Sequence, residues 1–104
     1  MPERTTEVSR PPLPLADVLK ALGDPTRLEI VRQMSVDGEV ACTTLEKTLH
    51  VSKATISYHI KALLHADLVT IRKEGRFYFY ALRSETLEAY VPGFGAHLRT
   101  VPGI

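Results

Sequence analysis

The hydrophobic period of this chain changes once, after Asp67, and this change limits the folds that the chain can adopt. Before that point aliphatic residues recur three and four positions apart, which is typical of amphipathic helices. In LVTIRKEGRFYFYAL, residues 68–82, apolar residues alternate instead. The alternation predicts a β-hairpin whose tip holds Glu74 and Gly75. The apolar residues expected on one side of this hairpin are Val69, Ile71, Phe77 and Phe79.

Turn and capping residues divide the rest of the chain into short helices. Leu15–Leu22 has one apolar face and is followed by Gly23, which favours a helix end. A second helix begins at Pro25, because proline suits the first helical position. A third runs to about Leu49, a fourth covers residues 52–65, and a last one follows the hairpin. The expected N-caps are Asp24, Thr43 or Thr44, Ser52 and Ser84.

The composition predicts one small domain with a single modest core, because the chain has 104 residues. Residues 1–12 are rich in proline and are expected to form a flexible arm. Residues 13–91 are expected to form the folded domain. Residues 92–104 are expected to form an irregular or kinked tail, because Pro92, Gly93 and Gly95 interrupt the helical spacing.

Several classes of protein do not fit this chain. It has no apolar run of the ~18 residues that a membrane span needs, and no apolar segment follows its first ten residues. The single cysteine, Cys42, cannot form an internal disulfide, which suits a reducing compartment. We therefore expect a cytoplasmic protein that does not contact a membrane. No nucleophile elbow, phosphate loop or metal triad is present, so we expect neither an enzyme nor a cofactor.

Positive charge gathers in one part of the chain. The net charge of the whole sequence is +1, but residues 51–82 alone carry +3 and residues 1–50 carry −2. On a helix, residues 53–65 separate into an apolar face, an opposite polar face and two flanking residues. The apolar face is Ile56, Ile60, Leu63 and Leu64. The opposite face is Ala54, Tyr58, Lys61 and His65, flanked by Thr55 and Ser57.

A short helix, a tight turn at His50 and Val51, and this capped helix predict a helix-turn-helix. The fourth helix suits the major groove of DNA, and the basic residues of the hairpin would lie against the adjacent phosphate backbone. The fold class is therefore mainly α, with about five helices and a two-stranded β-hairpin wing. Two alternatives remain: the polar residues are only the solvated face of a surface helix, or the domain is a protein-interaction module that does not bind DNA.

Three stretches, LADVLKALGDPTRLEIVRQM, VSKATISYHIKALLHADLV and IRKEGRFYFYAL, resemble the ArsR-type winged-helix regulators of bacteria. The resemblance covers roughly residues 13–90. It implies a homodimeric transcriptional repressor that binds an inverted-repeat operator in double-stranded DNA. In that family the first and last helices form the dimer interface. The matching residues here are Leu15, Val18, Leu19, Leu22, Leu87, Tyr90 and Val91.

Carried over by position, the family's groove-contacting residues are Ser52, Lys53, Thr55, Ser57, Tyr58 and His59. The wing contacts are Arg76, Arg72 and Lys73. Ser57 and Tyr58 are expected to contact bases, and Lys61 is expected to contact phosphate, which positions the protein without specifying sequence. Thr55 can bond its own helix instead, and His59 can be a packed, hydrogen-bonded histidine instead.

The inducer of such a repressor is not evident from the residues. Some relatives bind a metal through a CxC pair, but here Cys42 stands alone in EVACTTL, and an arsenical needs two or three thiolates. A second family site uses the last helix, where this chain has Glu85, Glu88 and His97. We expect no metal response. Cys42 is either a redox-responsive thiol at a helix N-terminus or a small buried residue.

Overall fold

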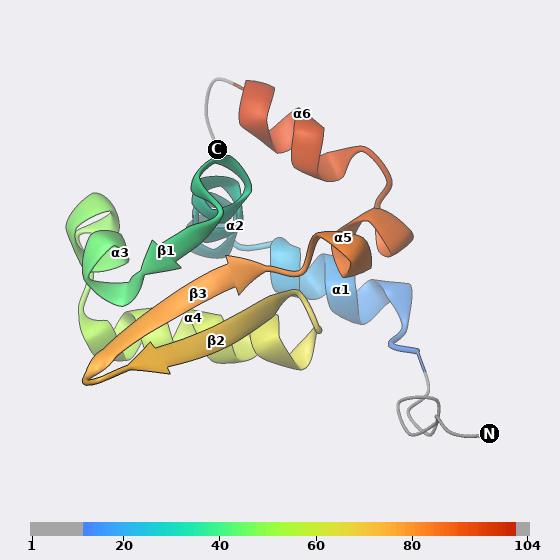
Figure 1. Cartoon of the computed structure of the whole chain (residues 1–104). Coiled ribbons are helices and arrows are strands. Elements are labelled where there is room, and N and C mark those ends of the chain that lie inside the picture. The colour runs from blue at the N-terminus through green and yellow to red at the C-terminus, as the bar shows by residue number, and fades with distance from the viewer. Residues whose placement is uncertain (1–11, 102–104) are drawn as a thin grey trace.

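The computed structural model of the protein describes residues 12–101, which form six helices and three strands (Figure 1). The helices are α1 (Leu15–Leu22), α2 (Pro25–Asp37), α3 (Cys42–Leu49), α4 (Lys53–His65), α5 (Ser84–Tyr90) and α6 (Phe94–Thr100). The strands are β1 (Glu39–Ala41), β2 (Val69–Glu74) and β3 (Phe77–Leu82). The winged helix-turn-helix prediction is confirmed, with β1 as an additional short strand. The predicted arm at 1–12 lies outside the described residues except for its last residue.

The three strands form one antiparallel sheet in the order β1-β3-β2. β1 lies between α2 and α3 in the sequence and pairs with the later part of β3, away from the hairpin turn. It therefore connects the start of the helix-turn-helix to the wing. Figure 1 shows α4 running behind the hairpin, on one side of the sheet. The sheet therefore holds the wing beside the helix that is expected to enter DNA.

The turn of the hairpin lies one residue later than predicted. Glu74 pairs with Phe77, so the two turn residues are Gly75 and Arg76 rather than Glu74 and Gly75. Because side chains alternate along a strand, a shift of one residue exchanges the two faces. Ile71 pairs with Tyr80, and Val69 pairs with Leu82. The prediction that Phe77 and Phe79 share the side of Val69 and Ile71 is therefore wrong.

The core lies between α2, α4 and the inner face of the sheet. α2 is central, because it packs against α1, α4, α6, β1 and β3. The most deeply buried side chains come from five of the helices, from β2 and from the segment before β2. They are Val18, Ile30, Val31, Met34, Leu45, Ile56, Leu63, Leu68, Val69 and Leu87. Burial of these aliphatic groups supplies most of the driving force for folding, at about 25 cal/mol per Å² removed from water.

Two of the four predicted helix caps are present. Asp24 caps α2, where its Oδ2 accepts from the amide of Arg27 at 3.0 Å. Ser52 caps α4, where its Oγ accepts from the amide of Thr55 at 3.2 Å. The caps expected at the other two helices are wrong: α3 begins at Cys42 without a side-chain cap, and Ser84 is the first residue of α5 rather than its cap.

The C-terminal part breaks where proline and glycine were expected to interrupt it. α5 ends at Tyr90, and α6 begins after Gly93, whose φ of +82° lies in the left-handed region that favours glycine. The expected tail is therefore helical over α6, which packs against α2 (Figure 1). Residues 102–104 lie outside the described part of the chain. Within residues 12–101, no helix is long and apolar enough to cross a membrane.

Candidate nucleic-acid interface

α3, a tight turn and α4 form the helix-turn-helix. His50 occupies the turn with φ +56° and ψ +44°, a left-handed conformation that a non-glycine residue adopts at some cost. After the turn, α4 is anchored by a row of buried side chains, Ile56, Ile60 and Leu63. Leu64 was expected in this row but lies at its edge and is partly exposed. The anchoring row leaves the opposite side of α4 directed toward solvent.

The solvent-facing side of α4 carries the side chains expected to contact DNA. Tyr58 is 66% exposed, and Lys53, Ser57 and Lys61 are also exposed. The Tyr58 ring lies edge-to-face on His59, with the ring centroids 5.1 Å apart, which limits its orientations. A helix whose solvent-exposed side is polar and positively charged suits insertion into the major groove.

Ser52 and Thr55 lie at the start of this helix, but they are bonded to each other. The Ser52 hydroxyl donates to Thr55 Oγ1 at 3.1 Å, in addition to accepting from the Thr55 amide. The structure thus shows Thr55 bonded within its own helix, one of the two roles considered for it. Both side chains help to fix the first turn of α4.

His59 turns away from the exposed side, toward the N-terminus of α2. Its Nδ1 lies 3.2 Å from Arg27 Nη1 and 3.8 Å from Asp24 Oδ2, and its side chain is only 12% exposed. Burial is the main reason that the pKa of His59 lies below its usual value, and Arg27 lowers it further while Asp24 acts in the opposite direction. The packed role for His59 therefore fits its surroundings better than a base contact.

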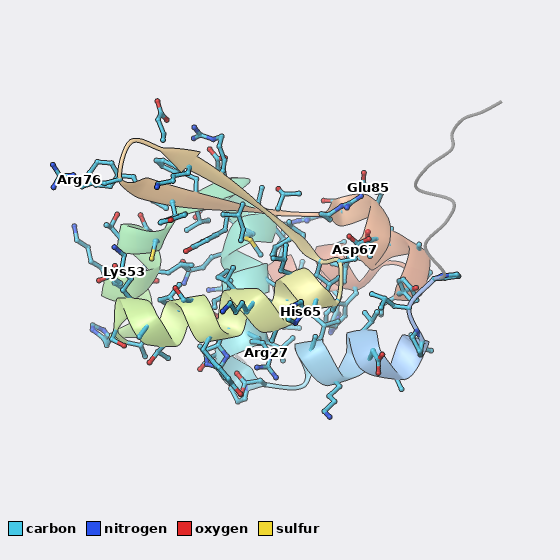
Figure 2. All side chains as sticks on the ribbon, turned by 90° about the horizontal axis from the view of Figure 1, so that it is seen from below. Arg27, Lys53, His65, Asp67, Arg76 and Glu85 are labelled. Carbon is cyan, nitrogen blue, oxygen red and sulfur yellow. The ribbon has the colours of Figure 1, made fainter. Side chains whose placement is uncertain are left out.

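The basic residues of the wing point to different sides of the sheet. Arg76 is exposed at the turn, and Lys73 lies on the face shared with Ile71, its Nζ 5.5 Å from the centre of the Tyr78 ring. Figure 2 shows Arg76 and Lys53 at the same end of the molecule. A groove of about 390 Å³ separates this face of the wing from α4. It is lined by Lys53, Ser57, Ile60, Lys61, Ile71, Tyr78 and Tyr80.

Arg72 lies on the outer face of the wing, where two carboxylates hold it. Its guanidinium donates to both carboxylate oxygens of Glu39, at 2.9 and 2.7 Å, and to Glu74 at 2.8 Å. It also covers the ring of Phe79, 4.4 Å from its centre. Two carboxylates thus already balance the charge of Arg72, and its contact with DNA stays a prediction.

Comparison with known proteins identifies the class of this fold. A family model described as a helix-turn-helix domain matches residues 22–72. An uncharacterized HTH-type transcriptional regulator of Bacillus subtilis is 40% identical over 80 residues, which cover 76% of this chain and 80% of that protein. The arsenical resistance operon repressor of Staphylococcus xylosus is 42% identical over 74 residues, covering 71% of this chain and 70% of that protein. A solved ArsR-like transcriptional regulator of Rhodococcus sp. has a TM-score of 0.65 at 31% identity, covering 80% of each chain. The chain belongs to the ArsR family.

This ArsR-family protein is thus a DNA-binding transcriptional regulator and not an enzyme. The family resemblance drawn from the LKALGDPTRLEIV segment and the residues after it is confirmed. The Bacillus subtilis relative matches 80 residues and the Rhodococcus structure covers 80% of this chain, so the likeness is not limited to the helix-turn-helix.

Cys42 of this ArsR-family chain is buried, with 3% of its surface exposed. It is the first residue of α3, and its Sγ lies 3.7 Å from Glu46 Oε2. Burial raises the pKa of the neighbouring Tyr80, and hydrogen bonding to Cys42 adds to this effect. Of the two roles considered for Cys42, these surroundings match the small buried residue, because oxidants and electrophiles react with accessible thiolates.

The residues expected at the dimer interface fall into two groups. Val18, Leu22 and Leu87 are buried within the single chain and contribute to its own core. Leu15 and Leu19 are half exposed on α1. Tyr90 and Val91 are partly buried, and the Tyr90 hydroxyl donates to the carbonyl of Leu13 at 2.6 Å, which holds α5 beside the start of α1 (Figure 1).

Residues that sequence reasoning missed lie on the first two helices. Arg27 contacts His59, and it lines a groove beside α4 together with Lys20. The only signal in the sequence is the position of Arg27, three residues after the cap Asp24 in the DPTR motif. That spacing places its amide under the cap and leaves its side chain to reach other elements.

Proposed function

We propose that this regulator is a homodimeric repressor that binds an inverted-repeat operator, with α4 in the major groove and the wing against the phosphate backbone. The observation that carries the proposal is the exposed side of α4, where Tyr58 stands between lysines on a helix held rigidly from behind. Lys73 and Arg76 add positive charge on the wing beside it. We also place the protein in the cytoplasm, where its operator would be.

The dimer is proposed to form through α1 and α5. Leu15 and Leu19 present an apolar surface that the single chain leaves in water, and such surfaces often mark protein contacts. Tyr90 and Val91 are partly exposed nearby. A two-fold dimer would place two copies of α4 about one turn of the duplex apart, roughly 34 Å, which matches two half-sites of an inverted repeat.

We further propose that the repressor does not respond to arsenical or cadmium ions. Within residues 12–101, no group of three or more His, Cys, Asp or Glu side chains could hold a metal ion. Cys42 is the only cysteine of the chain and it is buried. A redox response through Cys42 is the weaker alternative, because the thiol is buried.

Selection of duplexes from a random pool by the purified protein tests the proposal. The selected sequences are expected to contain an inverted repeat, and light scattering of the complex is expected to show two chains per duplex. Affinity for the selected duplex should fall steeply with salt, because binding releases counterions from the phosphates. Arsenite or Cd²⁺ added to the complex is expected to leave it intact. Binding without sequence preference, or one chain per duplex, would contradict the proposal.

Variants of the two contact types sharpen this test. Tyr58→Ala is expected to weaken sequence preference by about 1–3 kcal/mol per lost base contact. Tyr58→Phe keeps the ring and separates the role of the hydroxyl from that of the ring. Arg76→Ala is expected to weaken binding to all duplexes alike. If Tyr58→Ala leaves the selected sequence unchanged, α4 is not placed as proposed, and a protein-binding role becomes the better explanation.

A further inference from the structure

A second groove borders α4 on the side away from the wing. It has a volume of about 270 Å³ and lies where α1, the N-terminus of α2 and the second half of α4 meet. It is lined by Asp17, Lys20, Ala21, Arg27, Tyr58, Ala62, His65 and Ala66. Figure 2 shows Arg27 and His65 on the α1 side of α4, away from the end that holds Lys53 and Arg76. Tyr58 lines this second groove, whereas Ser57 and Lys61 line the groove on the wing side, so the two grooves flank the exposed face of α4.

The polar lining of this α1-side groove suits an anion. Lys20, Arg27 and His65 contribute side chains that donate N–H groups, against one carboxylate, Asp17. None of these four residues was expected to contact DNA, and none belongs to the wing. The groove is open and shallow rather than closed, so it fits a group on the surface of a large ligand better than a small molecule that must be enclosed.

Arg27 is already held in position before any ligand binds. Its Nε donates to the carbonyl of Ala21 at 2.7 Å, and its Nη1 lies 3.2 Å from His59 Nδ1. Nε and Nη1 lie on different edges of the planar guanidinium, so these two contacts fix its plane, and within residues 12–101 Nη2 has no hydrogen-bond partner. An arginine fixed in this way loses little side-chain entropy on binding an anion, and its geometry suits phosphate oxygens.

The shape of DNA explains why a second positive groove belongs here. An α-helix with its side chains is about 10–12 Å wide, and the major groove is about 12 Å wide. A helix that enters the groove therefore meets phosphates on both of its edges. The wing lies along one edge of α4, and the α1-side groove lies along the other.

We propose that Lys20, Arg27 and His65 bind phosphates of the DNA strand on the edge of the major groove opposite the wing. This inference rests on the proposed function. The N-terminal helix would then be a DNA contact as well as a dimer element. These contacts fix the depth and orientation of α4 and carry no sequence information of their own.

The test uses Lys20→Gln in the full chain, compared with Arg99→Gln as a matched control. Lys20 is exposed, and glutamine keeps a similar helix propensity, so the fold is expected to persist. Arg99 is an exposed residue of α6, on the opposite side of the molecule from α4, and its substitution removes the same charge (Figure 1). Arg27 is left unchanged in this test because it also anchors α4.

Binding is measured against salt for the selected duplex and for a scrambled duplex of equal length. Lys20→Gln is expected to lower the log–log salt slope by about one and to weaken both duplexes by the same factor. Arg99→Gln is expected to change neither. Asp17→Asn is expected to strengthen binding to both duplexes, because it removes the one carboxylate from the groove.

Phosphate ethylation interference on the selected duplex locates the contacts. Lys20→Gln is expected to lose interference at phosphates different from those lost in Arg76→Ala. An unchanged salt slope and an unchanged interference map in Lys20→Gln would overturn this inference while leaving the proposed function intact. If the unmodified protein shows no sequence-preferring duplex binding, both the inference and the proposed function fail.

Discussion

Two arginines hold α4 and the wing in place, and they do so in very different surroundings. Arg27 lies in a partly buried junction, where it joins the end of α1 to His59 of α4. Arg72 lies on the exposed outer face of the wing, where it joins β1 to the hairpin through Glu39 and Glu74. Each arginine links parts of the chain that are far apart in sequence.

The two arginines differ in how well water can solvate their partners once the arginine is removed. The partners of Arg72 are exposed carboxylates, which water solvates well once the arginine is gone, so exposed ion pairs add little stability. One partner of Arg27 is the carbonyl of the buried residue Ala21, in the last turn of α1, which has no helical amide to accept from. A buried polar group without a partner costs more than a hydrogen bond adds. We therefore expect the position of α4 to depend on Arg27 more than the position of the wing depends on Arg72.

The largest expected effect follows from Arg27→Ala. The substitution removes the donors to Ala21 and His59, and we expect the free energy of unfolding to fall by about 1–3 kcal/mol. Urea denaturation at neutral pH measures this change as a lower midpoint with an unchanged slope. Affinity for the selected duplex should also fall, because α4 loses its polar contact with α2 through His59.

Arg32→Ala on the same helix is the matched control. Arg32 pairs with Glu29 on the surface at 2.8 Å, so its loss should leave the denaturation midpoint close to that of the unmodified protein. Arg27→Lys retains the charge but cannot bridge two acceptors in one plane, and its midpoint should lie between those of Arg27→Ala and the unmodified protein. Equal midpoints for Arg27→Ala and Arg32→Ala would show that the junction is no more important than a surface pair.

A smaller effect is expected at Asp24, which supports the same junction from the other side. Asp24→Ala removes the cap of α2 and should destabilise the protein by about 1 kcal/mol. Asp24→Asn retains a capping oxygen and should cost less. If the two variants unfold at the same urea concentration, the cap is not the source of the stability that Asp24 provides.

Local patterns predicted much of the fold. Asp24, Gly23 and Ser52 set helix boundaries through bonds or conformations within a few residues, so their roles are visible in the sequence. The hairpin turn was misplaced because FYFY is aromatic in both phases, and alternation then fails to distinguish the inner face from the outer. Strand β1, at Glu39–Ala41, is too short for a periodic signal and exists because β3 offers it an edge.

The candidate site was predictable on α4 and much less so around it. Lys53, Ser57, Tyr58 and Lys61 are exposed as the helical spacing indicates, because burial on one helix follows from the sequence of that helix. The contact of Arg27 with His59 spans 32 positions, and that of Arg72 with Glu39 spans 33. Such contacts depend on how separate elements pack, and no local pattern in this chain predicts them.

Stability should decrease as the pH is lowered below about 6.5. Burial lowers the pKa of His59 below its ordinary value of 6.5, so the unfolded chain takes up this proton more readily than the native one. Full stability is therefore present above pH 6.5, and it is lost as the pH falls through the lower native pKa. Denaturation midpoints at a series of pH values measure this trend. His59→Gln should flatten it, whereas substitution of the exposed His97 by glutamine should not.

The smallest effect is expected from Arg72→Ala, which tests the other half of the comparison. Glu39 and Glu74 already balance the charge of Arg72, and both become solvated when it is removed, so the denaturation midpoint should scarcely change. Salt titration of DNA binding should give the same slope as the unmodified protein, whereas Arg76→Ala should lower that slope by about one. If Arg72→Ala lowers the slope as Arg76→Ala does, Arg72 must leave its carboxylates when DNA binds, and the wing would then be rebuilt on binding rather than held ready by its ion pairs.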